Sequence, residues 1–304
     1  MQHRIWIRQG EDADYLMKNS DPVSSGGLFS RTKCVPFMPL NLSATTLEAH
    51  VDIPGANPAS NPGKFADYPT QTGALFQWAN IYTGSQFGGG IRWAWSPHTS
   101  TQQTWDRNLI PMDFWDQLKV DHETCPPGYR RPTDGSTSAG ETAMNISNSE
   151  LRQSLFQNPK TGWNYGNDID NSVWGYYADG FFDRRSITNN TTVASGTPEI
   201  ANAGRLFYNT TSGSDHFNAS IFFPATGWLH YYDGSLRWTG QEGLYWTSTV
   251  SVFDDFSAAH KITHASALRV FYLLDEHGDP VNHACPWNQE VQSAAAIRCV
   301  KSNP

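Results

Sequence analysis

The last third of the chain repeats one pattern, in which short runs rich in β-branched and aromatic residues alternate with turn-forming residues. Runs of about four to eight such residues, bounded by Gly, Pro, Asn or Asp, are typical of strands. They occupy residues 220–223, 229–232, 236–238, 244–250, 267–273 and 295–300. Asp233-Gly234, between the second and third runs, favours a hairpin turn. The pattern therefore predicts an antiparallel sheet and restricts this part of the chain to a β-rich fold.

The composition favours β structure with long loops over a bundle of helices. The chain has 304 residues, of which 16% are charged and 13% aromatic, and it contains 25 Gly and 18 Pro. Gly and Pro among many Ser, Thr and Asn residues are typical of short elements joined by turns. The formal net charge is -8. Because acidic and basic residues are mixed along the chain, no basic stripe can neutralise phosphates, and we expect no nucleic-acid partner.

The sequence predicts neither a membrane span nor a zinc site. No apolar run approaches the roughly 20 residues of a membrane-spanning helix. Residues 1–4 do not lead into the apolar core of a signal peptide, so we expect that a leader has been removed or that export uses another route. The cysteines are too scattered for zinc, and their even number suggests disulfides in a surface protein. They are Cys34, Cys125, Cys285 and Cys299.

Residues 1–72 show no sustained helical period and contain Pro, Asn, Ser and Gly throughout. We expect an irregular N-terminal segment packed on a main domain of residues 73–304. Within this segment, residues 4–8 and 35–40 alternate apolar and polar side chains and predict short strands. The second would lie at a sheet edge, because its prolines cannot donate to a ladder.

One helix is predicted from Ser147 onward. Ser147 followed by Glu150 fits a capping box. Leu151 and Leu155 are four residues apart and would share one face of the helix. The alternative is a solvated loop with a chance match to the motif.

Three sequence blocks follow one another in a characteristic order: residues 125–133 (CPPGYRRPT), 245–249 (YWTST) and 296–301 (AIRCVK). Residues 73–79 (GALFQWA) and 223–228 (FPATGW) add two more. Together these blocks resemble the Fibrobacter succinogenes major paralogous domain, a branch of the C-type-lectin-like fold found on bacterial surface proteins. The sequence departs from that family by a long insertion after the Cys-Pro block. It also departs at Tyr129, Arg130 and Arg131, where Trp, His and Leu are usual.

The resemblance implies an α+β, C-type-lectin-like domain, in which a central twisted antiparallel sheet is combined with one or two short helices and long irregular loops. It places Trp78, Trp228 and Trp246 in the core. In such folds the last strand returns beside the early helical region, so the resemblance makes a Cys125–Cys299 disulfide reasonable. Two reduced, buried cysteines are the alternative.

A cluster of oxygen-bearing side chains after the predicted helix suggests calcium, a hard cation that takes six to eight oxygen ligands. The candidate ligands are Asn167, Asp168, Asp170 and Asn171. Asn and Asp are also ordinary turn formers, and the residue triplets of calcium-dependent sugar-binding lectins are missing. We therefore expect that calcium can bind here but that no cofactor is required.

Residues 163–185 are dense in aromatic side chains, including Trp174, with aspartates between them. Aromatic faces beside acidic and amide groups can stack on a sugar ring and hydrogen-bond its hydroxyls. Tyr and Trp are also enriched at protein interfaces. Simple packing of a long loop onto the domain is the alternative.

Residues 251–292 are predicted to carry the main ligand-binding loops. The candidate contacts are Phe253, Asp254, Phe256, His260, His264, Tyr272 and His283. Many residue types in this stretch can be reached from an adenine-rich asparagine codon by changing adenines. This layout is similar to the variable proteins of diversity-generating retroelements, which display mutable ligand-binding residues on the same fold.

An enzyme of the formylglycine-generating type shares this broad fold and uses a pair of nearby cysteines. Here Cys285 and Cys299 are the only cysteines close in sequence, and Cys299 already belongs to the end-strand block. A copper-thiolate site would need two converging, unbridged sulfurs. No other catalytic set stands out, so we expect a protein that is not an enzyme.

These observations predict an extracellular recognition module, an adhesin on a cell surface or at a pilus tip. Its expected partners are a glycan or a host or bacterial surface protein, together with other pilus or surface subunits. The alternatives are a phage receptor-binding protein, displayed on a virion, and the formylglycine-generating type of enzyme.

Overall fold

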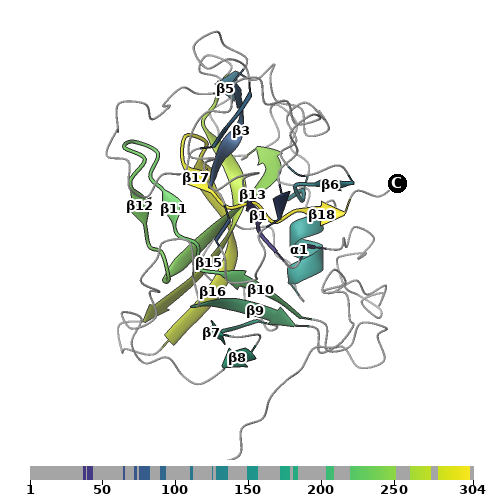
Figure 1. The fold of residues 1–304 in the computed structure, drawn as a ribbon, viewed down its shortest axis with the longest axis vertical. Coiled ribbons are helices and arrows are strands. Elements are labelled where there is room, and N and C mark those ends of the chain that lie inside the picture. The colour runs from purple at the N-terminus through teal and green to yellow at the C-terminus, as the bar shows by residue number, and fades with distance from the viewer. Residues whose placement is uncertain are drawn as a thin grey trace, which may run out of the picture.

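The computed structural model consists mostly of antiparallel sheets, with one short helix among the residues it describes (Figure 1). This agrees with the α+β class at a coarse level. The described residues are 37–38, 40–43, 64–65, 72–73, 75–82, 90–93, 110–111, 125, 128–135, 149–156, 172–178, 181–183, 203–208, 220–250, 261–274 and 280–301. The predicted strand at residues 4–8 lies outside them.

The central sheet has the order β13-β15-β16. Its strands are β13 (Glu242–Val250), β15 (His264–Leu274) and β16 (Pro280–Glu290). The first two confirm the strands predicted at residues 244–250 and 267–273, although both are longer. The third was missed, and residues 251–292 are therefore not all loops. Pro286 lies in β16 opposite Leu268, and proline is tolerated there because β16 is the edge strand of this sheet.

A second sheet packs on one face of the central sheet, in the lower part of Figure 1. It has the order β10-β9-β7-β8, with β7 (Ser172–Ala178), β8 (Phe181–Asp183), β9 (Ala203–Tyr208) and β10 (Ser220–Pro224). Aromatic rings join the two layers. The ring of Phe223 lies edge-on to those of Phe207 and Tyr245, with centroids 5.4 and 4.9 Å apart.

A third, five-stranded sheet has the order β12-β11-β17-β3-β4. Its strands are β3 (Phe76–Tyr82), β4 (Gly90–Trp93), β11 (Trp228–Leu229), β12 (Leu236–Arg237) and β17 (Ala294–Ala295). Trp78 and Trp246 are each only 1% exposed. Their indole N–H groups donate to the carbonyls of Thr247 and Phe76, at 2.8 and 2.6 Å. Both are core residues as predicted, whereas Trp228 is only partly buried.

The predicted last strand, residues 295–300, pairs with different partners along its length. Ala294 and Ala295 pair with β3, and Ala296 forms a parallel bridge with Tyr245. After Cys299, β18 (Val300–Lys301) pairs with β6 (Tyr129–Arg130). The short pairs β1 (Leu42–Ser43) with β2 (Lys64–Phe65) and β5 (Ile110–Pro111) with β14 (Lys261–Ile262) complete the strands.

The N-terminal segment contacts residues 297–300. The N–H groups of Met38 and Leu42 donate to the carbonyls of Cys299 and Ile297. Phe37 forms a bridge with Val300, and residues 35, 36 and 39 of the predicted strand lie outside the described residues. Phe37, Met38 and Leu42 therefore lie beside the C-terminal segment.

The helix α1 (Glu150–Leu155) begins three residues after Ser147, the predicted start. Its N-cap is Ser149, whose hydroxyl accepts from the N–H of Arg152 at 3.0 Å. Arg152 stands where a capping box has Glu or Gln, so the predicted capping box is wrong. Leu151 and Leu155 are both buried, but so are the other four residues of α1, so the helix has no single buried face. In the part of the chain that the structure describes, no helix is long and apolar enough to cross a membrane.

Candidate functional site

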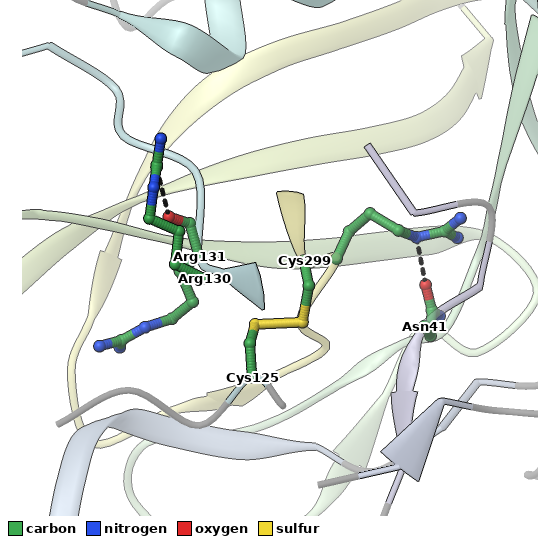
Figure 2. Close-up of a disulfide and its surroundings, with 6 residues drawn as sticks. Asn41, Cys125, Arg130, Arg131 and Cys299 are labelled. Carbon is green, nitrogen blue, oxygen red and sulfur yellow. Dashed lines mark hydrogen bonds between the residues drawn. A yellow bond between two sulfur atoms is a disulfide. The ribbon is translucent and has the colours of Figure 1, made fainter. Parts of the chain in front are cut away.

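The disulfide between Cys125 and Cys299 confirms the predicted pairing (Figure 2). The two Cα atoms are 6.1 Å apart, and the residues are 174 apart in sequence. The bridge lies between the Arg130–Arg131 segment and Asn41, which accepts a hydrogen bond from Arg298 at 2.8 Å. Cys285 is a free, buried cysteine, and burial raises the pKa of its thiol to about 12. Because the sulfur of Cys299 is bonded to Cys125, Cys285 and Cys299 do not form a pair of free thiols.

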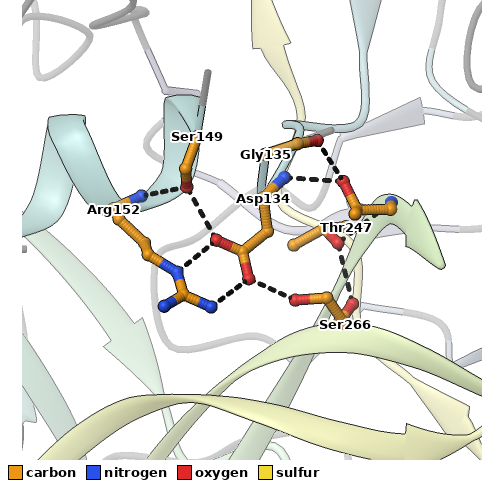
Figure 3. Close-up of polar contacts among 7 residues, drawn as sticks. Asp134, Gly135, Ser149, Arg152, Thr247 and Ser266 are labelled. Atoms are coloured by element: carbon orange, nitrogen blue, oxygen red, sulfur yellow. Dashed lines mark hydrogen bonds and ion pairs between the residues drawn. The ribbon is translucent and has the colours of Figure 1, made fainter. Parts of the chain in front are cut away.

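A buried polar network surrounds Asp134 (Figure 3). Its carboxylate accepts hydrogen bonds from the hydroxyls of Ser149 and Ser266, both at 2.6 Å, and from the guanidinium of Arg152. Burial alone would raise the pKa of Asp134, but the charge of Arg152 and these hydrogen bonds outweigh it and lower the pKa below its ordinary value. Since Asp134 is fully buried, this network has a structural role.

Most of the predicted ligand contacts cannot be placed. Phe253, Asp254, Phe256 and His260 lie outside the described residues, and so does the side chain of His283. The predicted calcium ligands Asn167, Asp168, Asp170 and Asn171 also lie outside them. Within the residues that are described, no three His, Cys, Asp or Glu side chains are grouped so that they could hold a metal ion. Calcium binding therefore stays a prediction.

The structure brings together Tyr272 and Trp174, which the sequence had assigned to two alternative binding regions. Both side chains are buried, and their ring centroids are 5.7 Å apart between the central and second sheets. His264 is half-buried at the start of β15, and its Nδ1 lies 2.8 Å from the hydroxyl of Thr263. Tyr272 and Trp174 thus form a contact between two layers.

Trp174 also lies directly opposite Arg205 in the pairing of β7 with β9. Arg205 is buried and donates from Nη1 to the hydroxyl of Ser172 at 2.6 Å. Among the described residues, its Nε and Nη2, like the indole nitrogen of Trp174, have no acceptor. Burial lowers the pKa of Arg205 to about 9. A buried cation with unsatisfied donors destabilises a fold. We therefore expect Arg205 to lower the stability of the interface between the central and second sheets.

The exposed aromatic residues lie elsewhere, on a surface that sequence reasoning did not assign to binding. Among the described residues, the large apolar side chains that are exposed are Tyr231 at 39%, Tyr232 at 57% and Trp238 at 56%. All three belong to the β11–β12 hairpin and the residue that follows it, at the left edge of Figure 1 and away from α1. We call residues 228–238 the aromatic hairpin.

Contacts between neighbouring rings connect this hairpin to the core. The ring centroid of His230 lies 5.8 Å from that of Trp228 and 4.4 Å from that of Tyr231, and Trp228 packs against the buried cluster around Trp246. The hairpin forms as predicted, with Leu229 opposite Leu236, but its connection is longer than the two residues Asp233-Gly234. The exposed rings are therefore carried on a base that is packed and hydrogen-bonded.

Trp238 has a backbone conformation that is unusual for its residue type. Its φ is 58°, and it is the one residue other than glycine with a positive φ in the described part of the chain. Left-handed backbone costs an L-residue with a Cβ atom about 1 to 2 kcal/mol. The Trp238 carbonyl accepts from the N–H groups of Gln241 and Glu242, at 2.9 and 2.8 Å. These bonds fix the strained residue with its indole ring half-exposed.

Polar groups lie between the exposed rings. Asp233 accepts from the N–H and hydroxyl of Ser235, at 2.9 and 2.6 Å, and the side-chain bond above all lowers the pKa of Asp233. An Arg237 nitrogen lies 3.6 Å from the Asp233 carboxylate. The aromatic hairpin thus presents ring faces, hydrogen-bond donors and acceptors, and two opposite charges that balance each other.

One sequence signal could have revealed this surface. Tyr231 and Tyr232 directly precede the turn dipeptide Asp233-Gly234, and the residues beside a tight turn are normally solvated. Because Tyr231 and Tyr232 are aromatic, the sequence pattern predicted a strand over residues 229–232 instead. In the structure the strand ends at Leu229, and residues 230–235 form the connection.

Comparison of the chain with family models, with curated proteins and with solved structures finds no match. The function of the chain is therefore inferred from its own residues.

Proposed function

We propose that the chain is an extracellular recognition module with a C-type-lectin-like fold, an adhesin on a cell surface or at a pilus tip. The observation that carries the proposal is the aromatic hairpin. Its Tyr231, Tyr232 and Trp238 are the exposed large apolar side chains of the described residues. Tyr and Trp are enriched among residues that dominate binding energy, and their clustering on one hairpin is typical of an interaction site.

Two further observations support the proposed fold. The resemblance implied that the last strand returns beside an early segment, and β18 pairs with β6 next to the Cys125–Cys299 bridge. The blocks that carry the resemblance also lie together, since Trp246 donates to the carbonyl of Phe76. A scaffold of this kind hosts many functions, so the binding role depends on the surface.

The disulfide supports a location outside the reducing cytosol, because disulfides persist in oxidising compartments. A glycan or a protein on a host or bacterial surface would be the partner. The predicted contacts in residues 251–292, including Phe253 and Phe256, would form a second ligand-binding region, one that a retroelement would diversify.

A glycan array and a cell-adhesion assay on the purified chain test the recognition function. We expect saturable binding that is lost in a variant of the ligand surface. Comparing Trp238→Ala with the double variant Phe253→Ala/Phe256→Ala shows whether the aromatic hairpin or the C-terminal stretch carries it. Turnover of a small substrate that is abolished by one substitution would contradict the proposal and favour an enzyme.

A further inference from the structure

We infer that the aromatic hairpin binds a neutral glycan and that the indole of Trp238 stacks on the C–H face of one sugar ring. The inference rests on the proposed recognition function and names its ligand class. It is built on Trp238, Tyr232, Asp233 and Arg237, and needs neither calcium nor the residues predicted at 251–292.

The conformation of Trp238 is the first observation that points to a ligand. Its φ of 58° suits Gly or Asn far better than an aromatic residue. Packing does not account for the indole, because 56% of the side chain is exposed. A strained residue that is held by its surroundings is a reason to look for function at that residue. Here the strained backbone belongs to a residue whose large, flat ring is exposed at the surface.

The size of the exposed surface favours a sugar over a protein. A large aromatic side chain offers about 150 to 250 Å², so three that are 39 to 57% exposed present roughly 300 Å² together. A stable protein interface needs about 800 Å² on each partner. A sugar ring needs only one ring face and a few hydrogen bonds, which Trp238 and its neighbours supply.

The charges on the hairpin indicate that the sugar is neutral. Asp233 and Arg237 have opposite charges and lie 3.6 Å apart, so they cancel at a distance and give no net attraction for a sulfated or phosphorylated polymer. At short range they act as an acceptor and a donor for sugar hydroxyls. The negative face of an aromatic ring attracts the weakly positive C–H groups of a pyranose.

Titration of the full chain with defined sugars tests the inference. The probes are the methyl glycosides of glucose, galactose, mannose and N-acetylglucosamine, neutral hexasaccharides of the same sugars, and a sulfated oligosaccharide as the charged control. Binding is followed by saturation-transfer NMR and by indole fluorescence. We expect at least one neutral probe to bind saturably in the presence of a calcium chelator, and the sulfated probe to bind no more tightly.

Two substitutions of Trp238 distinguish the effect of the ring on binding from its effect on folding. Trp238→Asn removes the ring and suits a left-handed backbone, so we expect binding to weaken about tenfold or more while the melting temperature stays the same or rises. Trp238→Phe keeps a ring in the strained conformation and should retain most of the affinity. Tyr232→Ala provides a second test of the surface if a substitution of Trp238 prevents folding.

Full binding by both Trp238→Asn and Tyr232→Ala would overturn the inference. Failure of every neutral probe would do the same. If the native chain adheres to cells or binds a protein but no sugar, the glycan assignment fails and the recognition function stands. If the native chain binds nothing in the array, the adhesion assay or the titration, both fail.

Discussion

The guanidinium of Arg152 grips the carboxylate of Asp134, donating from Nε to Oδ1 at 2.6 Å and from Nη2 to Oδ2 at 2.9 Å, and both side chains are fully buried (Figure 3). The pair joins the segment after β6 to α1, and the hydroxyl of Ser266 ties it to β15. One carboxylate thus links α1 and the segment after β6 to β15, from which Ser266 donates across 132 residues of sequence.

Removing the charge of Asp134 should destabilise the fold strongly. Asp134→Asn leaves Arg152 buried without a counter-charge, and breaking a buried ion pair in this way costs about 3 to 5 kcal/mol. Urea unfolding measures the loss. As a control, the double variant Asp134→Leu/Arg152→Met removes both charges and should recover part of the stability. A single variant as stable as the native chain would contradict the role of the pair.

Because of the Asp134 carboxylate, the free energy of unfolding should decrease at acidic pH. The pKa of Asp134 is lowered below its ordinary value of 3.8, so the folded state binds fewer protons than the unfolded state between the two values. Its contribution is present above about pH 3.8 and is lost as the pH falls through the folded pKa. Unfolding free energies measured between about pH 5 and 2.5 should fall more steeply for the native chain than for Asp134→Asn. Equal slopes of unfolding free energy against pH for the two proteins would contradict the contribution of Asp134.

Breaking the Cys125–Cys299 bridge should lower stability by about 2 to 5 kcal/mol, because it closes a long loop and restricts the unfolded chain. Cys125→Ser measured by thermal unfolding provides the test. Cys285→Ala is the matched control, since Cys285 is a free cysteine and its loss removes only a small buried side chain. Equal effects of the two substitutions would show that the bridge does not stabilise the fold.

Trp246→Ala should cost about 3 to 5 kcal/mol, the range for removing a large aromatic side chain from a core. The substitution also leaves the carbonyl of Phe76 without the indole donor. Trp246→Phe, which keeps a ring, should lose less. A soluble Trp246→Ala variant with a native melting curve would rule out the core position.

Arg205→Met should leave stability unchanged or raise it. Nε and Nη2 of Arg205 have no acceptor in the part of the chain that the structure describes, and replacing buried ionic groups by apolar ones of similar volume is often neutral or stabilising. Chemical unfolding of Arg205→Met, with Ser172→Ala as a control for the single hydrogen bond, measures the effect. A loss of more than about 2 kcal/mol would indicate that the guanidinium binds a partner.

Local patterns in the sequence predicted the features that depend on neighbouring residues. Asp233-Gly234 predicted the hairpin, because this dipeptide favours a tight turn between two strands, but the connection is longer than two residues and Leu229 lies opposite Leu236. The spacing of Leu151 and Leu155 placed them on one face of the helix, and both are buried. The strand blocks predicted buried Trp78 and Trp246, but Trp228, which was predicted in the same way, is only partly buried.

Tertiary contacts decided what these patterns left open. Strand β16 contains Pro286, His283 and Asn282 and has no clear strand signal, but pairing along all of β15 makes it a strand. The sequence predicted Ser147 as the N-cap, but Ser149 takes this place, and its hydroxyl also donates to Asp134. Residues 295–300 have one continuous strand pattern, yet β3 pairs with the start of this stretch and β6 with its end. Such pairings join residues far apart in the chain, so the free energy that selects them comes from partners that no local pattern contains.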